Sequence, residues 1–75
     1  MYCKDFIIML LEQKGGLSTR AEMRPFLMEQ GYSSDAIWQA YLRLKSEGKI
    51  ILKGSNKSKY QIVELNKFNE INKKS

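Results

Sequence analysis

The 75-residue chain contains no histidine, one cysteine (Cys3) and one proline (Pro25). Without histidine, the Ser-His and Cys-His pairs of nucleophilic catalysis are excluded. A single thiol also excludes a disulfide or a Cys/His zinc site within one chain. The acidic residues form no recognisable acid/base pair, and the glycines form no phosphate-binding motif. We therefore predict that the protein is not an enzyme and uses no cofactor or metal.

Long apolar runs are absent as well. The longest run covers residues 6–11, which is far shorter than a membrane span. Asp5 and Glu12 flank it and argue against a signal peptide. The lone cysteine fits a reducing compartment. We expect a soluble, cytoplasmic protein with no membrane partner.

Positive charge is concentrated in the last third of the chain. Residues 1–48 carry equal numbers of cationic and acidic side chains, whereas residues 49–75 carry seven lysines and two glutamates. The whole formal net charge of +5 therefore lies in residues 49–75. Such asymmetry favours a polyanionic partner, most simply nucleic acid, although a solvated lysine-rich surface has the same composition.

Residues 33–50 contain the clearest local pattern of the chain. Ser33 or Ser34 can cap a helix, and Asp35 suits the positive end of the helix dipole. Apolar residues at helical spacing then predict one buried face: Ile37, Ala40, Tyr41 and Leu44. Gly48 is a typical helix stop, and a short β-prone run follows it. The pattern predicts a helix over residues 34–47 and then a strand.

Shorter elements are predicted on both sides of this helix. Residues 2–14 indicate a first helix, Leu17 a strand of one to three residues, and Thr19 with Glu22 a capping box for a helix from Arg20 to about Gln30. The side chains of that second helix expected in the core are those of Met23, Phe26 and Leu27. Proline 25 should kink this helix or restart it as a 3-10 turn. Residues 49–53 and 59–64 predict a hairpin with a polar loop.

The segment 44–50 reads Leu-Lys-Ser-Glu-Gly-Lys-Ile, and it resembles the end of the recognition helix in the winged helix-turn-helix family. The resemblance implies an α+β, mostly helical fold with a three-helix core and a two-stranded wing. It also implies sequence-specific binding of double-stranded DNA by a small transcriptional regulator. Helix 34–47 would enter the major groove, and wing 49–63 would follow the phosphate backbone. The expected DNA contacts are Thr19, Ser34, Gln39, Arg43, Lys53, Lys57 and Lys59.

Two other functions stay open from the sequence. Trp38 and Leu42 lie one helical turn apart on the expected reading face. They either extend the core or form an apolar patch for a protein partner, in which case the domain is an interaction module. Binding of single-stranded nucleic acid is the third possibility. Tyr60 is the one aromatic residue of the wing, so a stacking platform is small.

The sequence also predicts a homodimer. The first helix is apolar around more than half of its circumference, and Leu65, Phe68 and Ile71 recur at a spacing of three. This second pattern predicts a short helix that packs on the first helix or across a dimer. The expected dimerisation residues are Phe6, Met9, Phe68 and Ile71. We assign residues 1–65 to one domain and residues 66–75 to a polar, basic tail.

Overall fold

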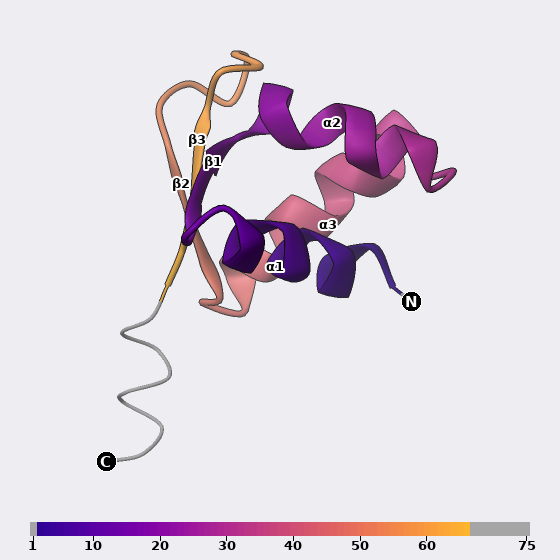
Figure 1. Ribbon diagram of the computed structural model, residues 1–75. Coiled ribbons are helices and arrows are strands. Elements are labelled where there is room, and N and C mark those ends of the chain that lie inside the picture. The colour runs from indigo at the N-terminus through magenta and orange to yellow at the C-terminus, as the bar shows by residue number, and fades with distance from the viewer. Residues whose placement is uncertain (1, 67–75) are drawn as a thin grey trace.

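The computed structural model describes residues 2–66. In chain order these residues form α1 (Cys3–Gln13), β1 (Leu17–Thr19), α2 (Arg20–Glu29), α3 (Ser34–Ser46), β2 (Ile50–Lys53) and β3 (Ile62–Leu65). The helices lie on one side of the small sheet (Figure 1). The described part is therefore an α+β structure with mostly helical content, as the sequence predicted. The short helix expected around Phe68 and Ile71 falls outside the described residues.

The sheet joins the short strand expected at Leu17 to the hairpin. Its strand order is β1-β3-β2, and both pairings are antiparallel. Ser18 lies opposite Val63 on one side of β3, and Leu52 lies opposite Val63 on the other. The prediction that Leu17 begins a strand pairing with the wing is thus confirmed.

Local capping explains where the helices begin and end. The Thr19 hydroxyl accepts a hydrogen bond from the Glu22 amide, and the Ser33 hydroxyl accepts one from the Ala36 amide. After α3, the Gly48 and Lys49 amides donate to carbonyls of the last turn, which forms a Schellman motif. Gly48 has a φ of 75°, a conformation that favours glycine. The predicted Thr19 cap of the second helix and the glycine stop are both confirmed.

The core lies between the three helices and the inner face of the sheet. Its buried residues are Ile7, Leu10, Leu11, Met23, Leu27, Ile37, Ala40, Tyr41, Leu44, Ile50 and Val63. All four apolar residues predicted for the buried face of α3 belong to it. Phe26 does not: its side chain is 48% exposed, and the Lys14 ammonium lies 5.8 Å from its ring centroid. The prediction that Phe26 faces the core is wrong, because the buried side of α2 is already occupied by Met23 and Leu27.

Two predicted boundaries also differ from the structure. The second helix continues as one α-helix through Pro25, so of the two alternatives predicted there, a kink or a 3-10 restart, the restart is wrong. Residues 59–61 were expected in the second strand of the hairpin, but β3 begins at Ile62. Gln61 is instead buried, and its side-chain amide donates to the Gly54 carbonyl and to Asn56 Oδ1 in the connection between β2 and β3. Side-chain contacts with the loop therefore replace strand pairing before Ile62.

Ordered contacts continue past β3 to Asn66. Its backbone amide donates to the Lys49 carbonyl at 2.9 Å, and its side-chain amide donates to the Gly48 carbonyl at 2.9 Å. These bonds join the end of β3 to the turn that follows α3. Among residues 2–66, no helix has the length and hydropathy needed to cross a membrane.

Candidate nucleic-acid interface

A cleft lies where the beginnings of α2 and α3 meet the wing loop, the connection between β2 and β3. Figure 1 shows this loop at the same end of the molecule as the start of α2. The charged side chains that line the cleft are Arg20, Arg24, Asp35, Lys57 and Lys59. Four of the five are cationic, and none of these five takes part in an ion pair within residues 2–66. The cleft therefore carries an excess of positive charge.

Arg20 connects the wing loop to both helices. Its Nη2 atom donates to the Asn56 carbonyl at 2.9 Å and to the Ser58 carbonyl at 2.6 Å. Its guanidinium carbon lies 4.6 Å from the centroid of the Trp38 ring, which is within the range of a cation–π contact. The backbone amides of Arg20 and Ala21 also donate to the Gln61 and Lys59 carbonyls. These bonds hold the loop against the first turn of α2.

Arg24 lies one helical turn after Arg20, on the same side of α2. Its Nη2 atom donates to the Ser34 hydroxyl at 3.0 Å, at the first residue of α3. A cation from α2 thus adds to the positive end of the α3 dipole. Neither arginine is among the DNA contacts predicted from the sequence, although their spacing of four residues puts them on one helix face.

Three of the seven predicted DNA contacts line this cleft: Ser34, Lys57 and Lys59. Both lysines are exposed, and the Lys59 ammonium lies 5.3 Å from the centroid of the Tyr60 ring. Hydrogen bonds within the loop, from the Lys57 amide to Ser55 Oγ and from the Tyr60 amide to Ser58 Oγ, fix its backbone. The two lysines therefore extend from an ordered loop.

Gln39 and Arg43 lie apart from the cleft. Both border a shallower depression between α3 and the start of α1, which also includes Tyr2, Cys3 and Leu42. Gln39 is exposed. Burial raises the pKa of the Cys3 thiol above its ordinary value, so the neutral thiol is favoured there. The depression is thus a second surface of α3, separate from the cationic cleft.

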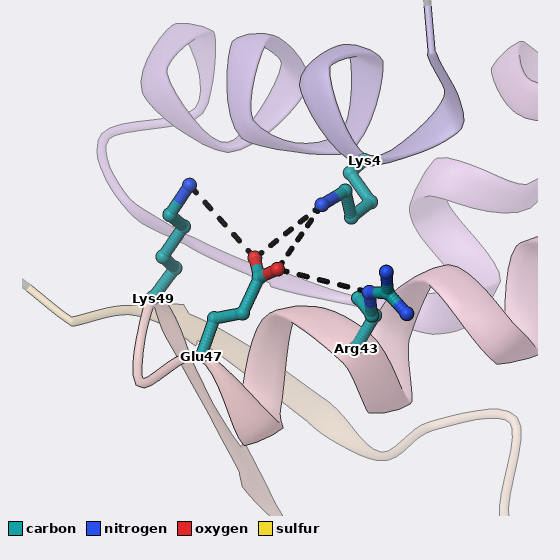
Figure 2. Close-up of polar contacts among 4 residues, drawn as sticks. All are labelled: Lys4, Arg43, Glu47 and Lys49. Carbon is teal, nitrogen blue, oxygen red and sulfur yellow. Dashed lines mark hydrogen bonds and ion pairs between the residues drawn. The ribbon is translucent and has the colours of Figure 1, made fainter.

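Arg43 belongs to a cluster of ion pairs around Glu47 (Figure 2). Its Nε atom lies 3.7 Å from one carboxylate oxygen, while the Lys4 and Lys49 ammonium groups lie 3.2 Å and 3.8 Å from the Glu47 carboxylate. The hydrogen bond from Lys4 is the main cause that lowers the pKa of Glu47. Residue Arg43 remains exposed, but its charge is partly neutralised.

The last two predicted DNA contacts have partners elsewhere. Lys53 forms an ion pair of 3.1 Å with Glu64 on the outer face of the sheet. The Thr19 hydroxyl accepts from the Glu22 amide and donates to the Glu22 carboxylate at 3.2 Å. The structure therefore does not bring the seven residues together at one surface.

Trp38 and Leu42 differ in their surroundings. Trp38 is half-buried, packs against the core and is covered by Arg20. The expectation that it extends the core is confirmed. Leu42 is also half-buried, but it borders the depression beside Cys3. The two side chains therefore do not form one open apolar patch.

Of the predicted dimerisation residues, Phe6 and Met9 are described. Phe6 is half-buried against the core, and its ring centroid lies 6.3 Å from that of Tyr32 in a tilted arrangement. Met9 is half-buried too. Packing within the chain thus accounts for part of the apolar excess of α1.

Comparison of the chain with protein-family models, with curated proteins and with solved structures found no match.

Proposed function

We propose that the protein binds double-stranded DNA as a winged helix-turn-helix transcriptional regulator, with α3 in the major groove and the wing loop along the phosphate backbone. The observation that carries this proposal is the convergence of Arg24, Lys57 and Lys59 at the beginning of α3. A helix N-terminus attracts phosphate groups because its free amides and its dipole both favour negative charge. Cations from two further elements around that end strengthen the attraction.

The anchoring of the wing loop supports the same function. Arg20 and Gln61 hold the loop through four hydrogen bonds, three to the backbone carbonyls of Gly54, Asn56 and Ser58 and one to Asn56 Oδ1. Lysines on a fixed loop lose less conformational freedom on binding than lysines on a mobile one. Arg20 also covers the Trp38 ring, which leaves less apolar surface for the alternative protein-interaction function.

The function is tested by titrating the protein against duplex DNA at several salt concentrations. Contacts to phosphates release counterions, so each contact should contribute about −0.9 to the slope of log K against log salt. We expect Gln39→Ala and Arg43→Ala to alter sequence preference more than overall affinity, because such side chains read base edges. Affinity that is absent, or independent of salt, would contradict the proposal.

A homodimer is the second part of the proposal. One short domain makes few base contacts, and two copies would read two half-sites. Because Phe6 packs against the core and the Tyr32 ring, the proposed interface rests mainly on Met9, Phe68 and Ile71. Sedimentation of the protein bound to DNA should give two copies per duplex, and a single copy at saturation would contradict the dimer without affecting DNA binding.

A further inference from the structure

Among residues 2–66, Asp35 is the one acidic side chain that lines the cationic cleft. It is the second residue of α3, and it is exposed. Arg24, Lys57 and Lys59 line the same cleft, yet the Asp35 carboxylate forms no ion pair with them or with any other residue from 2 to 66. The carboxylate is therefore available to a ligand at the beginning of α3.

Asp35 shares an exposed face of α3 with Gln39. Side chains four residues apart on an α-helix lie on the same face, one turn apart. Gln39 is exposed too, and it borders the depression beside α1, whereas Asp35 borders the cleft. The exposed surface of α3 between the two hollows therefore begins with a carboxylate and continues with an amide.

A carboxylate at this place repels phosphates and favours base edges that donate a hydrogen bond. An ionised carboxylate accepts hydrogen bonds and donates none. In the major groove, guanine presents two acceptors, and thymine presents an acceptor and a methyl group. Adenine presents one donor beside one acceptor, whereas cytosine presents a donor alone. Cytosine is therefore the base whose edge a carboxylate fits best.

The cations around Asp35 make a carboxylate compatible with DNA at this surface. Arg24 belongs to α2, and Lys57 and Lys59 belong to the wing loop, so the positive charge comes from elements other than α3. Contacts to phosphates position a protein on the duplex, while contacts to base edges select the sequence. In helix-turn-helix proteins the N-terminal residues of the recognition helix contact base edges. The cleft thus combines groups suited to both kinds of contact.

We propose that Asp35 is a specificity-determining residue that accepts a hydrogen bond from the N4 amino group of a cytosine. This inference rests on the proposed function and adds to it the base that the beginning of α3 selects. Asp35 and Gln39 are separated by about 6 Å along the helix axis, and base pairs are spaced by about 3.4 Å. The cytosine should therefore lie within about two base pairs of the position that Gln39 reads.

Selection of bound duplexes from a pool of randomised sequence, for the unchanged protein and for Asp35→Asn, tests the proposal. The unchanged protein should enrich cytosine at one position. Asp35→Asn should lose this preference and favour adenine there, because an amide pairs with both the N6 and the N7 atoms of adenine. In titrations with two duplexes that differ only at this base pair, the unchanged protein should bind the cytosine duplex about tenfold more tightly. Asp35→Asn should not retain that difference.

Glu29→Gln is the matched control. Glu29 is an exposed carboxylate of α2 that does not line the cleft and forms no ion pair within residues 2–66. Both variants remove one negative charge, but only Asp35→Asn should change the preferred base. If Asp35 served only to stabilise the positive end of the helix dipole, its replacement would lower the melting temperature and leave the preferred base unchanged.

The outcomes distinguish this inference from the proposed function. Duplex binding without a preference for cytosine, or with the same preference in Asp35→Asn, would overturn the role of Asp35 and leave DNA binding intact. Absence of binding to any duplex would overturn the proposed function, and the role of Asp35 with it.

Discussion

The two ends of α3 carry similar numbers of cationic side chains but use them differently. At the C-terminal end, Lys4, Arg43 and Lys49 surround the single carboxylate of Glu47 (Figure 2). At the N-terminal end, the four cations of the cleft make no ion pair within the described residues. At the C-terminal end all three cations share the one carboxylate as an ion-pair partner, whereas at the N-terminal end the cations have no such partner among residues 2–66 and are available to a ligand.

This difference distinguishes cations whose ion pairs join segments of the fold from cations that are available to bind a ligand. The Glu47 cluster joins α1 to α3 and to the turn before β2, so its ion pairs link three segments of the fold. The cations of the cleft repel one another, which is unfavourable unless a bound anion offsets the repulsion. Arg20 combines both kinds of role, since it is charged and also bonded to the wing loop.

Arg20→Ala should have the largest effect on stability. The change removes two hydrogen bonds from a charged donor to the loop backbone, together with the cation–π contact to Trp38. We expect a loss of about 2 kcal/mol, which corresponds to a fall in melting temperature of roughly 10 °C for a domain of this size. Thermal unfolding followed by circular dichroism measures the change.

Arg24→Ala is the matched control for this prediction. Arg24 has the same charge and lies on the same helix face, but it makes one exposed hydrogen bond to Ser34. Its removal should change stability by no more than about 0.5 kcal/mol. Equal melting temperatures for the two variants would show that Arg20 is not the anchor of the wing.

Elements defined by neighbouring residues were predicted well from the sequence. The helix α3, its Ser33 cap and its Gly48 stop depend on contacts within a few residues, and so does the capping box of Thr19 and Glu22. Failures occurred where contacts distant in sequence decide the structure. Residues 59–61 have β propensity, but the Lys59 and Gln61 carbonyls accept from the Ala21 and Arg20 amides at the start of α2, so this segment does not pair as a strand.

The site was predicted only in part for the same reason. Counting lysines identifies the basic wing, but not that Lys53 forms an ion pair with Glu64 while Lys57 and Lys59 form none with any residue from 2 to 66. Arg20 and Arg24 resemble ordinary helix charges until α2 is packed beside α3 and the loop. The spacing of the two arginines indicates that they share one face of α2. Only the tertiary structure shows that this face contacts α3 and the wing loop.

Lys57→Ala and Lys59→Ala should each weaken duplex binding by about tenfold near 0.1 M salt and reduce the salt slope by about 0.9. Lys49→Ala and Lys45→Ala are controls of equal charge, one from the Glu47 cluster and one from the exposed side of α3. Their effect should be smaller, because neither lines the cleft. Equal losses in all four variants would mean that net charge, and not the cleft, determines affinity.

Glu47→Gln should produce the smallest effect of these changes. The direction in which it alters the pH dependence of the free energy of unfolding tests the role of the Glu47 ion pairs. The pKa of Glu47 is lowered in the folded protein, chiefly by the hydrogen bond from Lys4, so the unfolded chain takes up a proton first as the pH falls. The ion pairs therefore stabilise the fold above the ordinary carboxyl pKa of 4.5, and this contribution is lost as the pH falls through the lowered value. Denaturant unfolding should show that the free energy of unfolding falls less between pH 7 and pH 3 in Glu47→Gln than in the unchanged protein. Asp5→Asn is the control for the loss of one acidic charge, because Asp5 makes no ion pair within residues 2–66.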